Sequence, residues 1–241
     1  MSFVWIILAA VLGAGVAAVT GFGIGSILTP VVAFKTGMKL AVSVVAFPHF
    51  VATLVRFLKL RRHVDQRVFW TFGVMNAAGA LIGALLHGAA NSSALKWLLA
   101  ALLLFVGLLS VFGYAERMRF GRLVAWPAGA VSGLLGGLVG NQGGIRSAAM
   151  LGLNVEREAF VATATGIALI VDVARIPVYL YGDADATLKL WPAVVVATLA
   201  CVVGTFAGAG VLSRIPRPLF RRVVGAVLLL AALLLVVRRS N

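Results

Sequence analysis

Two glycine-rich stretches decide the fold of this chain. They are Gly21-Phe-Gly-Ile-Gly25 and Gly136-Gly-Leu-Val-Gly-Asn-Gln-Gly-Gly-Ile-Arg-Ser147. Each lies inside a long apolar region, and the two are about 119 residues apart, close to half of the 241-residue chain. Glycine disfavours a continuous helix because it loses the most backbone freedom on ordering. We call residues 21–25 and 136–147 the first and second glycine breaks, and their spacing predicts a duplicated unit.

The composition predicts an all-α integral membrane protein. Hydrophobic residues make up 62% of the chain and the mean hydropathy is +1.07, whereas soluble domains are about 45–50% apolar. Apolar runs of roughly 20 residues alternate with short polar segments, which is typical of transmembrane helices. The runs lie at about 3–20, 22–35, 40–58, 68–89, 94–114, 123–139, 143–154, 157–181, 189–212 and 219–237. We predict about eight transmembrane helices, plus short broken or re-entrant helices after the glycine breaks.

The formal net charge of +14 does not indicate nucleic-acid binding. Most lysines and arginines fall in short loops between apolar runs, and no soluble face is present to carry a basic surface. The single cysteine, Cys201, lies in an apolar run, which excludes an internal disulfide and a cysteine metal cluster. The N-terminus lacks the basic region of a signal peptide, so we expect residues 1–20 to form a retained helix.

Loop charge predicts the orientation of the helices. Residues 59–67, 115–122 and 213–222 are basic, whereas residues 182–188 are acidic and residues 88–96 carry only Lys96. Basic loops stay on the cytoplasmic side, so we place the three basic loops inside and the other two outside. The helix at 40–58 and its counterpart at 157–181 then run in opposite directions, and both chain termini lie outside.

These directions predict two inverted repeats, residues 1–118 and residues 119–241, which together form one transport domain. The alternative is a plain eight-helix bundle whose halves are parallel. Broken helices at matching positions of two halves are the best sequence pointer to the binding site of a secondary transporter. We therefore interpret the chain as a membrane transporter.

The duplication extends beyond the glycines. Lys39-Leu-Ala-Val-Ser43 leads into a helix that reaches Arg56, and Glu158-Ala-Phe-Val-Ala-Thr163 leads into one that reaches Arg175. The two arginines are themselves 119 residues apart. With these motifs, and over essentially its whole length, the chain resembles the sulfite exporter TauE/SafE family, also called the TSUP family. Members of that family carry a glycine-rich stretch and a following proline near the start of each half, then an alanine-rich helix.

The resemblance implies transport of sulfite, an organosulfonate or a related small anion by a multi-pass protein of the bacterial inner membrane. The chain departs from the family pattern in both breaks. Ile24 stands where a glycine is common, and the second break has Asn141-Gln142 ahead of its glycine pair and Ala149 where the proline would fall. The more polar second break suggests a specialised substrate.

Arg146 is the strongest candidate for substrate binding. It follows Gly143-Gly144 and opens a short apolar segment, so we expect it deep in the bilayer, where an arginine faces a cavity or a partner. A helix N-terminus offers free N–H groups, and a guanidinium matches the oxygens of carboxylate, sulfonate or phosphate. The alternative is a structural arginine paired with a carboxylate.

The other candidates for substrate binding surround the breaks. Asn141, Gln142 and Ser147 can donate hydrogen bonds to an oxyanion, or can satisfy carbonyls freed by the break. Gly21, Gly23 and Gly25, like Gly143 and Gly144, allow close approach of the backbone to a ligand, although close helix packing competes with that interpretation.

Three further residues carry charge or protons inside predicted helices. Asp172 and Arg175 are three residues apart and can pair, either as a structural ion pair or with Asp172 as a proton-coupling carboxylate. His49, in the middle of its helix, can bind substrate, carry protons or pack through a hydrogen bond. For Arg56 we expect a side chain that extends to the membrane surface. We expect the five tryptophans to anchor helix ends at the interface.

The sequence favours a secondary carrier that works by alternating access, with the anion site at the two breaks. It contains no paired catalytic carboxylates, phosphate-binding loop or nucleophile motif, so we predict that it is not an enzyme. We predict no metal and no cofactor, with coupling to protons or another ion gradient left open. An anion channel, or a carrier of a small carboxylate or another anion, is the alternative. The expected partners are a small anionic substrate and the lipid bilayer, with no nucleic acid, and the protein is a monomer or a homodimer.

Overall fold

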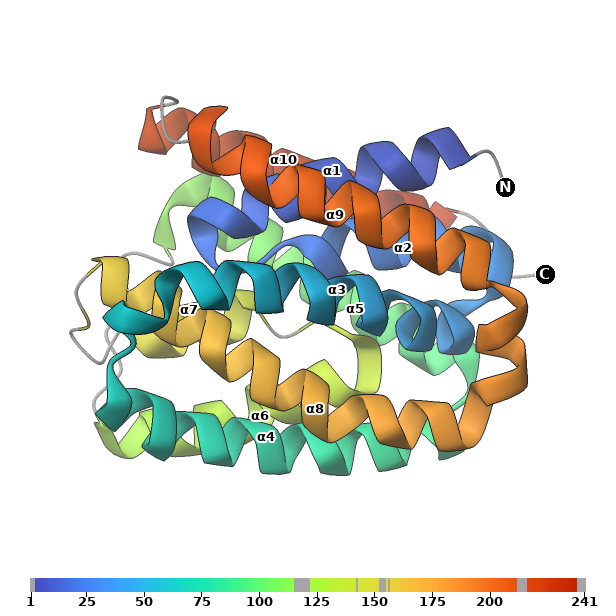
Figure 1. Ribbon diagram of the computed structural model, residues 1–241, viewed down its shortest axis with the longest axis horizontal. Coiled ribbons are helices and arrows are strands. Elements are labelled where there is room, and N and C mark those ends of the chain that lie inside the picture. Colours follow the sequence, from blue (N-terminus) through green and yellow to red (C-terminus); the bar gives the residue numbers. More distant parts are fainter. Residues whose placement is uncertain are drawn as a thin grey trace.

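Helices account for nearly all of the structure (Figure 1). The computed structural model describes residues 3–114, 122–141, 143–151, 155, 157–211 and 216–237, and in these residues there is no strand. The first half holds α1 (Phe3–Thr20), α2 (Ile24–Thr36), α3 (Met38–Leu60), the 3₁₀ helix η1 (Arg61–His63), α4 (Gln66–Ala89) and α5 (Ser92–Phe112). The second half holds α6 (Arg122–Val139), α7 (Gly143–Leu151), α8 (Arg157–Lys189), α9 (Trp191–Val211) and α10 (Arg217–Val237). The all-α prediction is confirmed.

Six of the described helices are long and apolar enough to cross a membrane: α1, α3, α4, α5, α8 and α9. The prediction was about eight, so the described helices that meet both criteria give a count that is not exactly the predicted one. The apolar stretches described in α6 and α10 are shorter, at Trp126–Val139 and Arg222–Val237.

The described helices that follow the glycine breaks are short. α2 has 13 residues and α7 has 9, which correspond to about 20 and 14 Å at 1.5 Å per residue. The apolar core of a bilayer is about 30 Å thick. As described, neither helix is long enough to cross that core alone, which fits the short broken or re-entrant helices predicted after the glycine breaks.

The two halves have opposite orientations. α3 and α8 pack against each other, and His49 contacts Asp172 while Arg56 contacts Thr165. Residue numbers rise along one helix as they fall along the other, so the two helices are antiparallel. This arrangement is the one that inverted repeats require, and it contradicts the alternative of parallel halves. The boundary between residues 118 and 119 lies outside the described residues and stays a prediction.

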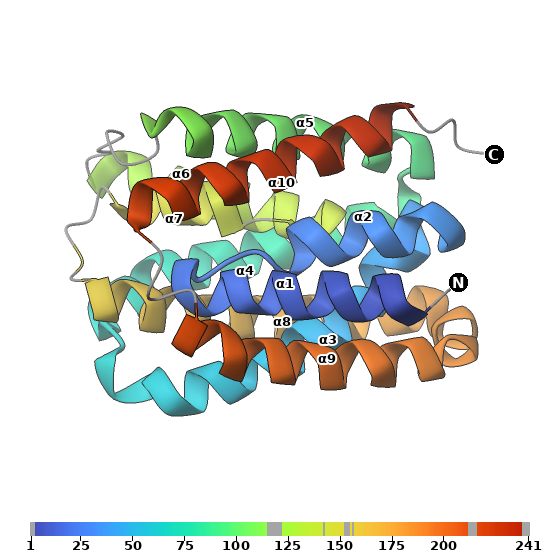
Figure 2. The same cartoon turned by 90° about the horizontal axis from the view of Figure 1, so that it is seen from above.

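The two halves interlock rather than sit side by side (Figures 1 and 2). α1 packs on α9, α4 on α6, α5 on α10 and α3 on α8, and each pair joins one half to the other. Glycines bring α4 and α6 into backbone contact: a methyl group on Gly83 would collide with the carbonyl oxygen of Leu134. Asn76 Nδ2 also donates to the Gly129 carbonyl at 2.8 Å.

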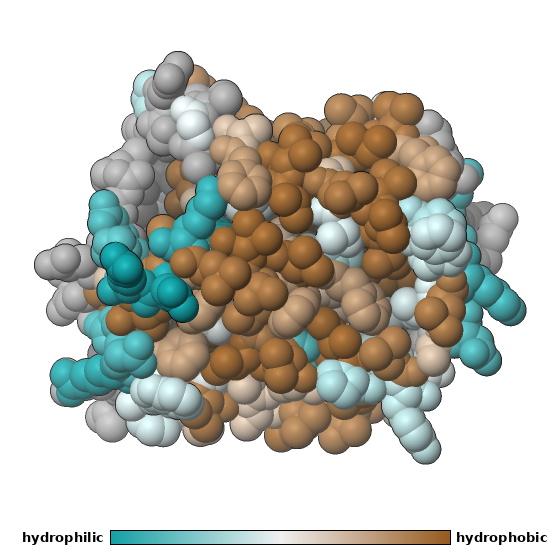
Figure 3. All heavy atoms as spheres, viewed as in Figure 1, coloured by the Kyte–Doolittle hydropathy of each residue, from teal (hydrophilic) through white to brown (hydrophobic). Residues whose placement is uncertain are grey.

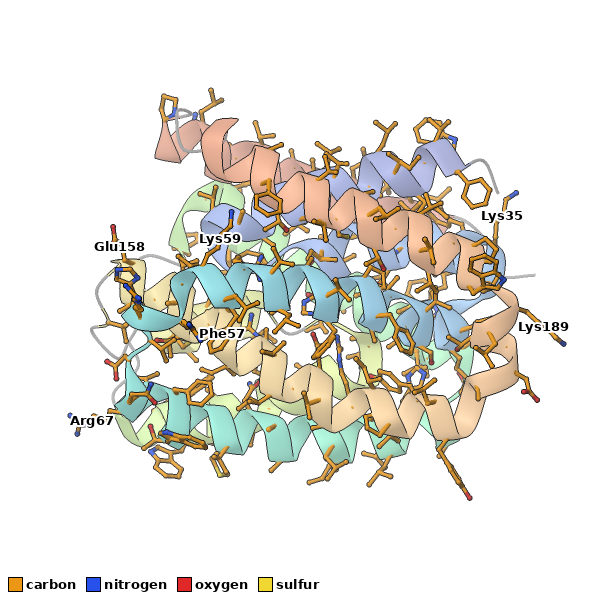
Figure 4. The ribbon with its side chains drawn as sticks, in the orientation of Figure 1. Lys35, Phe57, Lys59, Arg67, Glu158 and Lys189 are labelled. Atoms are coloured by element: carbon orange, nitrogen blue, oxygen red, sulfur yellow. The ribbon has the colours of Figure 1, made fainter. Side chains whose placement is uncertain are left out.

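The surface has an apolar middle and polar ends (Figure 3). Lys59, Arg67 and Glu158 lie at one end, which we call the basic end, and Lys35 and Lys189 lie at the other (Figure 4). Helix α1 begins and α10 ends at the end opposite the basic end (Figure 2). All five tryptophans are exposed and lie in the first two turns of their helices, as an interfacial belt requires. They are Trp5, Trp70, Trp97, Trp126 and Trp191.

One predicted connection is helical. Residues 182–188, expected as an outer loop, continue α8 to Lys189. Aspartate, alanine, threonine and leucine are all tolerated in a helix, and the first proline after Gly182 is Pro192. Asp183 and Asp185 make the sequence after Gly182 polar, so the last turns of the helix are less apolar than the rest of α8.

Candidate functional site

The two glycine breaks meet at the centre of the bundle. Gly21 has a φ of 80° and Gly140 a φ of 69°, a left-handed conformation that glycine adopts without strain. These two residues are 119 positions apart, so both halves bend at the same point of the repeat. Gly25 lies directly against Gly140, because a methyl group on Gly25 would collide with the Gly140 carbonyl oxygen. The contact depends on glycine at this position.

A small cavity lies between the breaks. Its lining comes from both halves: Phe22, Gly23, Gly25, Ser26, His49, Gly140, Asn141, Gly143, Arg146 and Arg175. It is about large enough for one water molecule. Beside it, Ser26 Oγ, one residue after the first break, donates to Asn141 Oδ1 of the second break at 2.9 Å.

Arg146 carries unpaired donors into this cavity. It lies near the start of α7 and only 2% of its surface is exposed. Its Nη2 donates to the Gly21 carbonyl oxygen at 3.1 Å, which again links the two breaks. Among the described residues, none accepts a hydrogen bond from its Nε or Nη1. Buried donors without a partner are rare and unfavourable, so this guanidinium favours a ligand that supplies oxygen atoms.

A second arginine in the cavity is neutralised. Arg175 Nη2 lies 2.8 Å from Asp172 Oδ1, and Arg175 Nε donates to the same oxygen at 3.0 Å. The other carboxylate oxygen lies 2.6 Å from Nδ1 of His49, which comes from α3 of the first half. Asp172 is thus shared by one charged and one titratable partner, and a single carboxylate ties α3 to α8.

Arg175 and Tyr179 also donate hydrogen bonds to backbone carbonyls at the second break. Arg175 Nη1 donates to the Gly136 carbonyl at 2.7 Å, and the Tyr179 hydroxyl donates to the Gly137 carbonyl. Both carbonyls lie in the last turn of α6, where carbonyls run out of intrahelical partners, and the Gly136 carbonyl also accepts the Gly140 N–H at 3.0 Å. Backbone breaks at membrane depth need such partners. The ion pair therefore has a structural role whatever else it does.

The buried charges do not balance. In the part of the chain that the structure describes, the buried cations are Arg56, Arg146 and Arg175, and the one buried acid is Asp172. With a neutral His49 the centre of the protein carries an excess of positive charge. Uncompensated charge away from water is costly, and an anion would neutralise part of it.

The structure brings most of the predicted binding residues together. Gly23, Gly25, His49, Asn141, Gly143 and Arg146 line the cavity, Gly21 contacts Arg146, and the Asp172–Arg175 pair lies at its edge. Gly144 and Ser147 are not among the lining residues. Gly144 packs against the Val106 side chain of α5, and Ser147 is buried one position past Arg146. Gln142 lies outside the described residues.

Sequence reasoning missed some residues and misplaced one. Phe22, Ser26 and Gly140 line the cavity; Ser26 could have been found as the first polar side chain after the first break. Arg56 was expected to extend to the membrane surface, and this expectation is wrong. Its side chain is buried, with 4% exposed, and Nε donates to Thr165 Oγ1 at 3.0 Å. The packing of α3 on α8 buries it, which the sequence of one helix cannot reveal.

Comparison with known proteins identifies a family. The family model described as sulfite exporter TauE/SafE matches residues 6–235, nearly the whole chain. Comparison with curated proteins and with solved structures gave no match.

Proposed function

Because the chain belongs to the sulfite exporter TauE/SafE family of multi-pass membrane transporters, we propose that it carries a small oxyanion, such as sulfite or an organosulfonate, across the bacterial inner membrane. In this proposal the anion binds where the two glycine breaks meet, and the protein is a secondary carrier that works by alternating access. Family membership supports transport rather than catalysis. The identity of the anion and the site are our proposal.

One observation carries the proposed site: the buried Arg146 guanidinium has two nitrogens without partners beside a cavity lined by both breaks. An oxyanion with several oxygens can accept from both nitrogens at once. The neighbouring α7 N-terminus adds a partial positive charge. A cation would meet only unfavourable charge there, because the one buried acid described is already paired.

The alternating-access mechanism rests on the inverted halves and on the small cavity. Inverted repeats can exchange conformations, so that a central site opens first to one side and then to the other. A cavity the size of one water molecule is too small for the four heavy atoms of sulfite. The breaks must therefore separate for the anion to enter, as in a gated carrier. An anion channel, which holds a continuous pore open, is the alternative, and trans-acceleration in a counterflow assay distinguishes the two.

The binding test uses Arg146. A thermal-shift screen of purified protein against sulfite, sulfate, thiosulfate, sulfonates and small carboxylates first identifies the anion that stabilises the folded state most. Calorimetry then measures its affinity. Loss of one charge-assisted hydrogen bond costs roughly 1.5–3 kcal/mol, so Arg146→Ala should bind about ten- to a hundredfold more weakly. Arg146→Lys keeps the charge but loses the planar fork, so an intermediate loss is expected.

The matched control is Arg62→Ala, which removes an exposed arginine from the basic end and should leave affinity unchanged. Folded, monodisperse Arg146→Ala protein with wild-type affinity would show that Arg146 is structural and that the site is elsewhere.

A further inference from the structure

A seam of polar residues leads from the central cavity toward the basic end, between α3 and α8. His49, Thr53 and Arg56 are spaced by four and three residues, so they share one face of α3. His49 lines the cavity and contacts Asp172. Two turns further along, Arg56 contacts Thr165 of α8. Thr53 lies between these two contacts and is completely buried.

The two repeats differ at this seam in one informative way. Asp172 and Arg175 of the second half correspond, 119 residues earlier, to Thr53 and Arg56 of the first. In the second half the carboxylate neutralises the arginine at 2.8 Å. In the first half a threonine occupies the position of the carboxylate. No acid among the described residues lies within ion-pair distance of Arg56.

Both members of the first-half pair have unused hydrogen-bonding atoms. Arg56 is 4% exposed, and its Nη1 has no partner among the described residues. The same holds for Thr53 Oγ1, one turn away on the same face. Arg56 Nε is occupied by Thr165, whose own hydroxyl donates to the Val161 carbonyl at 2.7 Å. A guanidinium nitrogen and a hydroxyl are thus left unpaired together, where the second half has an ion pair.

We propose that Arg56 and Thr53 form a second anion-binding site, between the central cavity and the basic end. This inference rests on the proposed transport of an oxyanion, because the same anion would occupy both sites in turn. Arg56 Nη1 and the Thr53 hydroxyl would donate to its oxygens. The site depends on the absence of a carboxylate at position 53. An aspartate there would form a salt bridge with Arg56 and leave no free charge for an anion.

The second site also gives the anion a route. An ion leaving Arg146 toward the basic end would otherwise cross apolar packing, which is costly for a charge. Two sites in series, each with one unpaired arginine, let binding be favourable enough for entry and weak enough for release. The site lies on the seam shared by α3 and α8, the two helices that must shift if the halves exchange conformations.

Selenite tests the proposal, because it has the shape and charge of sulfite and its selenium scatters anomalously. Crystals of the wild-type protein soaked in selenite should show two anomalous peaks, one against Arg146 and one against Arg56. Thr53→Asp should lose the peak at Arg56 and keep the one at Arg146, because the new carboxylate neutralises Arg56 as Asp172 neutralises Arg175. Thr53→Asn, which has nearly the same volume without the charge, should keep both.

The possible results separate the two proposals. A wild-type peak at Arg146 alone overturns the second site and leaves the proposed function standing. A peak at Arg56 alone supports an anion site there and removes the central one. No peak at either arginine overturns both. A peak at Arg56 that survives in Thr53→Asp at undiminished height overturns the second site, since its anion would not depend on the free charge. The wild-type result decides even if a variant fails to fold.

Discussion

Asp172 contacts two residues, Arg175 and His49, and the buried arginines differ in whether they have such a carboxylate partner. It holds Arg175, which in turn holds the carbonyl of Gly136, and it positions His49 at the cavity. Arg146 and Arg56 have no such partner among the described residues. One arginine is therefore committed to structure, and two are available to an anion.

We predict that Asp172→Asn destabilises the protein severely. Removing one partner of a buried ion pair commonly costs about 3–5 kcal/mol, because the other charge is left uncompensated. Thermal unfolding in detergent should show a large loss, and exchange and pH-driven accumulation should fall together. Glu158→Gln is the control: its carboxylate is 82% exposed and 3.7 Å from His63, and exposed pairs contribute little.

A different result would assign Asp172 to proton coupling. If Asp172→Asn keeps wild-type stability and anion exchange but loses pH-driven accumulation, then the carboxylate carries a proton. Its contact with His49, which lines the cavity, is the observation that keeps this role open. In that case the structural interpretation of the pair is wrong.

At the scale of helices, contact between halves depends on glycine as well as on apolar side chains. Lipid is as apolar as leucine, so helices associate in a bilayer through close packing and hydrogen bonds. On α4 and α6 the glycines Gly83 and Gly133 each face a backbone carbonyl of the other helix. This packing brings the backbone close enough for the hydrogen bond from Asn76 to Gly129.

We predict that Gly83→Val separates α4 from α6 and destabilises the protein by about 1–3 kcal/mol or more, as overpacking does. A side chain at position 83 would overlap the Leu134 carbonyl, and a backbone atom cannot move aside cheaply. Gly88→Val is the matched control. Gly88 lies on the same helix, and nothing lies within 4 Å of a Cβ added there. The melting temperatures of the two variants in detergent provide the comparison, and equal values would contradict the packing argument.

Most helix boundaries could be predicted from the sequence because apolar runs and basic loops follow directly from the bilayer. α1 begins and ends where the apolar run does, and α9 differs by at most two residues. The extension of α8 through residues 182–188 could not be predicted from hydropathy, since a helix continues into water wherever its residues allow.

The site could be predicted only in part, for a physical reason. Glycines and an arginine at a break are visible in a sequence, because both are costly at membrane depth. The residues that contact those groups cannot be read from the sequence. Ser26 reaches Asn141 across 115 residues, and Arg56 is buried by a helix from the other half. Such contacts depend on how the halves pack.

At the scale of the molecule, the two ends carry different charges, and we predict how they face the membrane. The end that holds Arg62 should lie in the cytoplasm, and Asp185 should lie outside. Single cysteines at 62 and 185, in a Cys201→Ala background, test this prediction with an impermeant maleimide. Both replaced residues are exposed, and Cys201 is buried. Intact cells should show labelling at 185, with position 62 reacting only after permeabilisation.

Labelling at both positions from the same side of intact cells would contradict this orientation. Because α3 and α8 are antiparallel, their C-terminal ends lie at opposite ends of the molecule, where Figure 4 labels Lys59 and Lys189. The experiment therefore decides which end faces the cytoplasm, and with it the direction in which the seam from the central cavity leads.

The interlocked halves also constrain how the protein is inserted into the membrane during its synthesis. α1 leaves the ribosome first, yet the helix it packs on is α9, and α4 likewise waits for α6. During synthesis the first half therefore sits in the bilayer with its glycine-lined surfaces uncovered, and contacts between residues so distant in sequence form late. Quality control of the nascent chain can act on this unfinished state. We therefore expect a substitution that delays insertion of the second half to increase degradation of the chain.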